Sequence, residues 1–241
     1  MEYGLQMYSV RDITQDDLLG ALSKVADLGY GFVEFAGFFG NSAEAVKSRL
    51  DAIGMRVSGT HTPLREIEAD INAVIKYHLA IGNKNIIIPG HDLSDQAKID
   101  DFINRVNRVM PALSDNGITL GYHNHSHEFQ PNTDGSMVHD QLVYRTDLLL
   151  EIDTFWYYNA TGYSAVEIME RLKDRLHFIH IKDGFRGGKG VPLGNGEAPV
   201  CEVYKKAVSL NVPMVVESET LTPDGMTEAK ICIEYLRNIE K

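Results

Sequence analysis

The stretch LLLEIDTFWYYNATGYSAVEIMERLKDRLHFIHIK, residues 148–182, contains the pattern that decides the fold. Its two apolar runs, 148–153 and 177–182, have the length and composition of buried strands. The segment 164–173 between them has the apolar periodicity of a helix. Because parallel strands need a crossover connection, usually a helix, this stretch predicts one strand–helix–strand unit of a parallel sheet.

The same alternation recurs along the whole chain. We expect strands at 3–9, 32–36, 56–60, 85–89, 119–123, 148–153, 177–182 and 214–217. We expect helices at 15–28, 42–53, 66–81, 96–116, 136–144, 164–173, 201–210 and 225–238. Eight such units use all 241 residues, and neither a linker nor the glycine fingerprint of a doubly wound sheet is present. The sequence therefore predicts an α/β protein with a single (β/α)8 TIM barrel as one domain, residues 1–241.

Composition narrows the classes of partner. The formal net charge of −11 makes the average surface repel nucleic acid, so no nucleic-acid partner is expected. No window reaches transmembrane length and no signal-like segment opens the sequence, so we expect a cytoplasmic protein without a membrane partner. Cys201 and Cys232 lack the spacing of a zinc motif and are expected to be ordinary helix residues. A small-molecule substrate fits this composition best.

Polar residues gather where the later strands end, which is where TIM barrels carry their active sites. The fifth strand continues into YHNHSHEF (122–129), the sixth ends at Asp153, the seventh reads HIKD (180–183), and the eighth ends in VESE (216–219). Side chains alternate along a strand, so four of these residues are expected to point at one place: His123, Asp153, His180 and Glu217. Mixed carboxylates and imidazoles suit one divalent metal ion, Mn²⁺, Co²⁺, Zn²⁺ or Mg²⁺.

These motifs, together with LGNG (193–196), resemble the sugar phosphate isomerase/epimerase superfamily. That superfamily comprises the xylose-isomerase-like TIM barrels and includes inosose dehydratase, ketose 3-epimerase and endonuclease IV branches. The resemblance implies a single metal ion held by a Glu, an Asp, a His and a second Glu from strands five to eight. Asp153, His180 and Glu217 match three of these ligands.

The fifth strand departs from the family pattern. Many relatives read Glu-Asn-His where this chain reads His123-Asn124-His125. Either His123 takes the ligand position or Glu128 reaches back from the loop, and we favour His123 because strand ends hold ligands more precisely than loops. In the ketose epimerase branch both metal-bound glutamates are thought to shuttle protons, and only Glu217 of that pair is present here.

Further residues at the barrel mouth are candidates for catalysis or substrate binding. Lys182 is expected either to stabilise a developing enolate or to pair with a carboxylate. Trp156 either stacks on a sugar face or anchors the packing, and Arg186 lies in a glycine-rich loop that either binds phosphate or forms a lid. The substrate-binding candidates are Glu34, His61, Asn124, His125, Trp156 and Arg186. A structural role stays open for Glu34 and His61.

The predicted function is a metal-dependent sugar isomerase or epimerase that transfers a proton through an enediolate. The base is expected to be Glu217 or one of His123, His125 and Glu128. The first alternative is a lyase that eliminates water or an aglycone from a keto-inositol or a 3-keto-sugar. An AP endonuclease and a catalytically inactive sugar-binding barrel are further alternatives. The sequence leaves the substrate, the metal and self-association into a homo-oligomer open.

Overall fold

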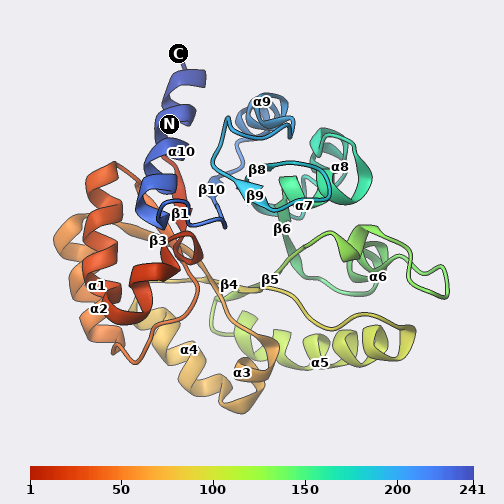
Figure 1. Cartoon of the computed structure of the whole chain (residues 1–241). Coiled ribbons are helices and arrows are strands. Elements are labelled where there is room, and N and C mark those ends of the chain that lie inside the picture. Colours follow the sequence, from red (N-terminus) through yellow and green to blue (C-terminus); the bar gives the residue numbers. More distant parts are fainter.

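Eight parallel strands close into a barrel in the computed structural model, which describes residues 1–241 (Figure 1). The order around the barrel is β1-β10-β7-β6-β5-β4-β3-β2. The strands are β1 (Gly4–Gln6), β2 (Phe32–Phe35), β3 (Arg56–His61), β4 (Asn85–Ile88), β5 (Thr119–His123), β6 (Leu149–Asp153), β7 (Leu176–Ile181) and β10 (Met214–Val216). The predicted (β/α)8 barrel is confirmed.

Helices cover the outside of the barrel, as Figure 1 shows. They are α1 (Arg11–Leu28), α2 (Ala43–Ile53), α3 (Leu64–Ala69), α4 (Ile71–Ala80), α5 (Gln96–Ser114), α6 (Val138–Arg145), α7 (Thr154–Thr161), α8 (Val166–Arg171), α9 (Val200–Leu210) and α10 (Gly225–Ile239). The last helix packs beside the first, and the amino group of Met1 contacts Glu240, so the two ends of the chain meet. No helix combines the length and apolar character needed to cross a bilayer.

The inside of the barrel changes from apolar to polar along its axis. Phe32, Phe178 and Val215 form a buried apolar cluster from three strands. Gly4 leaves the room for this cluster, because a Cβ there would lie 2.2 Å from the ring of Phe32. Two residues further along β2 and β7 come Glu34 and His180, both fully buried. Charged side chains are therefore placed at the carboxyl ends of the strands, above an apolar plug.

Two expected elements have wrong boundaries and one helix was not expected, each for a local reason. The first strand ends at Gln6, whose side chain accepts a hydrogen bond from the Tyr8 amide and begins a 3-10 helix at Met7–Val10. The helix expected at 66–81 is two helices, because Asp70 leaves the helical conformation and caps α4. Helix α7, which was not expected, begins directly after β6, where Asp153 provides the cap.

A short hairpin, β8 (Asp183–Gly184) and β9 (Gly190–Val191), follows β7 and was also not expected. The carboxylate of Asp183 holds the segment behind it by accepting hydrogen bonds from the amides of Gly184, Gly194, Gly196 and Ala198. A Cβ at Gly196 would lie 2.3 Å from Asp183 Oδ1. The loop around residues 193–196 therefore surrounds this carboxylate with backbone amide donors.

Candidate metal centre

A cavity of about 380 Å³ opens at the carboxyl ends of the strands. Its lining includes Tyr8, His61, His123, His125, Glu217 and Glu219. These residues come from both halves of the barrel, and the charged ones project from strand ends or from the residues just beyond them. The cavity therefore lies where TIM-barrel enzymes bind their substrates.

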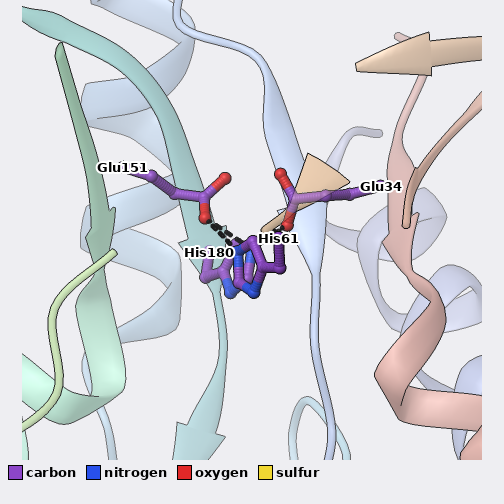
Figure 2. Close-up of side chains that lie close together, drawn as sticks. All are labelled: Glu34, His61, Glu151 and His180. Carbon is purple, nitrogen blue, oxygen red and sulfur yellow. Dashed lines mark hydrogen bonds and ion pairs between the residues drawn. The ribbon is translucent and has the colours of Figure 1, made fainter. Parts of the chain in front are cut away.

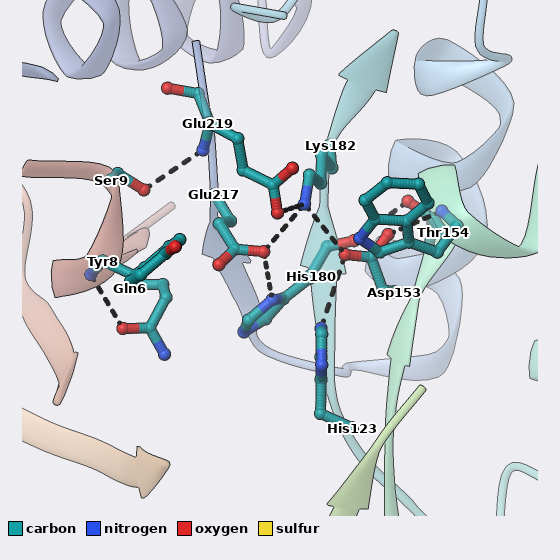
Figure 3. Close-up of polar contacts among 12 residues, drawn as sticks. Gln6, Tyr8, Ser9, His123, Asp153, Thr154, His180, Lys182, Glu217 and Glu219 are labelled. Carbon is teal, nitrogen blue, oxygen red and sulfur yellow. Dashed lines mark hydrogen bonds and ion pairs between the residues drawn. The ribbon is translucent and has the colours of Figure 1, made fainter. Parts of the chain in front are cut away.

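Four buried side chains from four adjacent strands meet at the floor of this cavity. They are His123 on β5, Asp153 on β6, His180 on β7 and Glu217 just after β10. One ligand atom from each lies within 4.8 Å of all the others (Figure 3). His123 Nε2 is 3.4 Å from Asp153 Oδ2, and His180 Nδ1 is 3.3 Å from Glu217 Oε2. We call this set the upper cluster.

The local fold fixes the direction of Asp153. Its Oδ1 accepts a hydrogen bond from the Trp156 amide, which caps α7. Asn124 binds the backbone of Asp153 twice, through the amide at 3.0 Å and the carbonyl at 3.3 Å. Asp153 Oδ2 is left buried without a hydrogen bond and faces His123 and Lys182.

Lys182 brings a buried ammonium group to the same place. Its Nζ lies 2.9 Å from Glu217 Oε2, 2.7 Å from Glu219 Oε1 and 3.5 Å from Asp153 Oδ2 (Figure 3). The ammonium also lies 5.0 Å from the centre of the Trp156 ring, a cation–π distance. Lys182 is thus a positive charge held among carboxylates of the cavity floor.

Lys182 and the carboxylates of Asp153 and Glu217 stabilise one another in their charged forms. Burial acts to raise the pKa of Asp153 and of Glu217, but Lys182 and the neighbouring imidazoles together outweigh it and hold both carboxyls below their usual range. Burial acts to lower the pKa of Lys182, and the surrounding carboxylates raise it instead. For Glu219 burial prevails, so its pKa is raised. Asp153 and Glu217 are therefore ionised and Lys182 is charged at neutral pH.

His123, at the end of β5, and His125, just beyond it, are neutral. Burial, with a further contribution from the charge of His180, lowers the pKa of His123 to about 4. Burial also lowers the pKa of His125 to about 4. Both nitrogens of His123 are buried without a hydrogen bond. A neutral imidazole has a lone pair that a metal ion or a substrate proton can use.

A second set of residues, all buried except the partly exposed His61, shares His180 with the upper cluster (Figure 2). This lower cluster consists of Glu34 on β2, His61 on β3, Glu151 on β6 and His180. Burial acts to lower the pKa of both imidazoles, but the two carboxylates outweigh it. The pKa of His61 rises to about 9, and that of His180 rises well above its usual value. The same contacts lower the pKa of Glu151 against the effect of burial.

The donor atoms of the upper cluster fit a divalent cation. Two carboxylates and two imidazoles form a mixed O/N set, which first-row divalent metals accept. Asp153 Oδ2 and both nitrogens of His123 lack hydrogen-bond partners, an arrangement that buried polar atoms in proteins rarely keep without a ligand. The four carboxylates of the two clusters, together with Glu219, outnumber the cationic groups beside them, Lys182, His61 and His180, so added positive charge is favourable there.

Several predicted site residues have other contacts in the structure. Glu128 is fully buried, and its carboxylate accepts hydrogen bonds from the Tyr122 hydroxyl and the His125 amide, so it braces the loop and does not reach the upper cluster. The side-chain amide of Asn124 makes its hydrogen bonds to the backbone of Asp153. Arg186 is exposed in the β8–β9 loop, outside the cavity lining.

The remaining substrate-binding candidates lie at different depths along the barrel axis. His61 and His125 line the cavity. Glu34 lies beneath it, in the lower cluster, and is fully buried. Trp156 is half-buried and its ring lies against Lys182. The structure thus brings His61 and His125 to the cavity, places Lys182 behind two of its lining carboxylates, Glu217 and Glu219, and places Glu34 in the lower cluster.

Three residues of the site were not predicted from the sequence. Glu219 lines the cavity and binds Lys182, and Glu151 joins the lower cluster. The alternation of side chains along a strand indicates that both face the same way as a predicted ligand, because Glu219 is two residues after Glu217 and Glu151 is two before Asp153. Gln6 donates a hydrogen bond to Glu34, and a single glutamine in an apolar strand gave no comparable signal.

Known proteins share this architecture. The family model of the xylose isomerase-like TIM barrel matches residues 22–239. A sugar phosphate isomerase/epimerase from Parabacteroides distasonis is 22% identical, with a TM-score of 0.84 over 98% of this chain and 93% of that one. The probable 3-DHS dehydratase AsbF from Bacillus anthracis is 13% identical, with a TM-score of 0.78 over 99% of both chains.

An L-ribulose 3-epimerase is 14% identical, with a TM-score of 0.74 over 99% of this chain and 94% of that one. At these identities the solved structures establish the fold alone. No curated protein sequence matches this chain significantly. The family model covers most of the barrel, including all four residues of the upper cluster. The chain therefore belongs to the xylose isomerase-like TIM-barrel family.

Proposed function

We propose that this protein is a metal-dependent isomerase or epimerase that acts on a small sugar or keto-sugar by proton transfer through an enediolate. The observation that carries the proposal is the convergence of four buried ligand atoms within 4.8 Å of one another at the floor of a cavity. A cavity of about 380 Å³ has the size of a small-molecule site. A small sugar-like substrate is the partner that we propose.

His123, Asp153, His180 and Glu217 would hold the cation. A divalent cation bound there supplies Lewis-acid polarisation of a substrate carbonyl, which lowers the barrier for removing the adjacent proton. The four donors leave Lys182 and Glu219 beside the same cavity. Mn²⁺, Co²⁺, Zn²⁺ and Mg²⁺ all remain candidates, because the donor set does not select among them.

The residues of this chain would carry the proton. Glu217 lines the cavity and is ionised, so it is our candidate for the general base. His125 lines the cavity and is neutral, so it can accept or return a proton. Lys182 would stabilise negative charge that develops on a substrate oxygen, because its ammonium is held within the site by three carboxylates.

One observation keeps a lyase as the second candidate. The fifth strand presents His123 in place of a carboxylate, so a symmetrical pair of glutamate bases is absent. An elimination needs one base and one acid to protonate the leaving oxygen. Glu217 and the charged Lys182 would supply these roles for a keto-inositol or a 3-keto-sugar.

Proton exchange tests the proposal directly. The purified chain, supplied with Co²⁺ or Mn²⁺, is incubated in D₂O with a panel of ketopentoses, ketohexoses, keto-inositols and 3-keto-glycosides, and products are followed by NMR. An isomerase exchanges a proton beside the carbonyl for deuterium and removes no group from the substrate, whereas a lyase releases water or an aglycone. No exchange and no product from any member of the panel would contradict the proposal.

Two variants make this experiment specific. Glu217→Gln removes the candidate base while keeping the size of the side chain, and we expect exchange to fall by at least about 100-fold. Glu202→Gln, on the exposed surface of α9, removes one negative charge without touching the cavity and serves as the matched control.

A further inference from the structure

His180 is the one residue that belongs to both buried clusters. Its Nδ1 faces Glu217 in the upper cluster, at 3.3 Å. Its Nε2 faces Glu34 and Glu151 in the lower cluster, at 2.7 and 3.2 Å. The two nitrogens of one ring therefore have different surroundings, and whichever atom carries a fixed proton decides which one is available to a ligand.

The lower cluster fixes that proton on Nε2. His61 Nε2 lies 2.8 Å from Glu151 Oε2 and 3.1 Å from Glu34 Oε2, so imidazole nitrogens and carboxylate oxygens alternate around a closed ring (Figure 2). The rings of His61 and His180 lie nearly parallel, with 5.4 Å between their centres. An ionised carboxylate only accepts hydrogen bonds, so each Nε2 must donate. His180 keeps its Nε2–H whether the ring is neutral or charged.

Glu34 is itself held by a residue of β1. Gln6 donates from Nε2 to Glu34 Oε2 at 2.6 Å, and its Oε1 accepts from the Tyr8 amide at 3.0 Å. The backbone contact sets which end of the Gln6 amide faces Glu34. Gly59 of β3 leaves space beside the carboxylate, because a Cβ there would lie 3.1 Å from Glu34 Oε1. The position of Glu34 is thus determined from three strands.

We propose that Glu34, held by Gln6, is a positioning residue that keeps the proton of His180 on Nε2 and so presents Nδ1 to the cation of the upper cluster. Metal-bound histidines commonly donate their other N–H to a carboxylate, which fixes the tautomer and the ring orientation. This inference rests on the proposed cation site. It assigns Glu34 a role through His180, and it gives a reason for a fully buried glutamate beneath the cavity.

The test uses the full-length chain and two measurements. Co²⁺ affinity is measured by calorimetry, and the imidazole N–H of His180 is observed by NMR on protein with ¹⁵N-labelled histidine, assigned with His180→Gln. In the wild type we expect a slowly exchanging Nε2–H, and Zn²⁺ is expected to shift the Nδ1 resonance. Glu34→Leu removes the acceptor, so we expect Co²⁺ affinity to fall about 10- to 100-fold and the Nε2–H to exchange rapidly.

Conservative variants separate positioning from a merely structural role. Glu34→Gln retains an acceptor oxygen and is expected to recover most of the affinity and the slow N–H signal. Gln6→Met leaves Glu34 in place but removes its donor, and a several-fold loss of affinity is expected. This second variant also provides the test if Glu34→Leu does not fold. Glu202→Gln is the control for loss of one charge.

Two results would overturn the inference. One is a Glu34→Leu chain that is folded, binds Co²⁺ within twofold of the wild type and keeps the slow N–H signal. The other is a Zn²⁺ shift on Nε2 in the wild type. A wild-type chain that binds no divalent ion contradicts the proposed function instead, and the N–H signal still reports whether Glu34 fixes the proton.

Discussion

Replacing Lys182 with methionine should have opposite effects on stability and on cation affinity. The ammonium is buried and lies within 3.5 Å of three carboxylates, two of which belong to the upper cluster. Without it, Asp153 and Glu217 lose the cation that they share, and His180 remains beside Glu217. In the metal-free protein, removal of one partner from a buried ion pair costs about 3–5 kcal/mol. We expect about 3 kcal/mol, because Glu219 is part-exposed and His180 stays charged.

The cation should compensate for this loss. Lys182 and the cation are both positive and share Glu217 and Asp153, so the ammonium competes with the metal in the wild type. We expect Lys182→Met to bind Co²⁺ at least about tenfold more tightly, which corresponds to about 1.4 kcal/mol. At a fixed Co²⁺ concentration well above both dissociation constants, the stability gap between the two chains should narrow by about that amount.

Urea unfolding with EDTA and with Co²⁺ measures both effects. For a chain of this size, about 3 kcal/mol corresponds to a decrease of about 6–12 °C in Tm, so thermal scans give a second reading. Lys205→Met, an exposed change on α9, controls for the loss of one lysine. If Lys182→Met were as stable as the wild type in EDTA, or if the gap stayed constant on adding Co²⁺, the assignment of Lys182 would be refuted.

Three further outcomes are expected. Because the raised pKa of His180 keeps its Nδ1 protonated at neutral pH, cation binding should release a proton and strengthen from pH 6 to 8, as calorimetry in buffers of different ionisation enthalpy would detect. The pKa of His61, about 9 in the folded metal-free chain, lies above its unfolded value, so its contribution of up to about 3 kcal/mol is complete below pH 6.5 and is lost as the pH rises through 9. In urea unfolding at pH 6 and pH 9.5, His61→Asn should show a smaller difference than the wild type. Gly196→Ala should cost about 1–3 kcal/mol in the same assay, because its Cβ would lie 2.3 Å from Asp183 Oδ1.

The barrel could be predicted from the sequence because its signal is repeated. Eight apolar runs alternate with helical segments, so an error at one boundary does not change the topology. The boundaries that failed depend on single side chains that bind the backbone. Gln6 ends the first strand, Asp70 divides a helix, and Asp153 begins α7. Periodicity does not report such capping contacts, because each involves one residue and not a repeat.

The upper cluster could be anticipated because strand order and alternation decide which side chains point to the barrel mouth. His123, Asp153, His180 and Glu217 are brought together as expected from those two rules. The lower cluster could not be anticipated from the sequence, because Glu34 and His61 lie on strands across the barrel from Glu151. Depth along the barrel axis depends on the stagger of the strands, which no local pattern gives.

Metal analysis of the purified chain tests the central claim most directly. The wild type, Asp153→Asn and Glu202→Gln are loaded with Co²⁺ or Mn²⁺, dialysed, checked for folding by circular dichroism and analysed for metal. We predict about one divalent ion per chain in the wild type and in Glu202→Gln, and loss of that ion in folded Asp153→Asn, because Oδ2 of Asp153 is a buried oxygen that makes no hydrogen bond. A folded wild type that retains no ion, or an Asp153→Asn variant that retains as much as the wild type, would contradict the assignment of the metal centre.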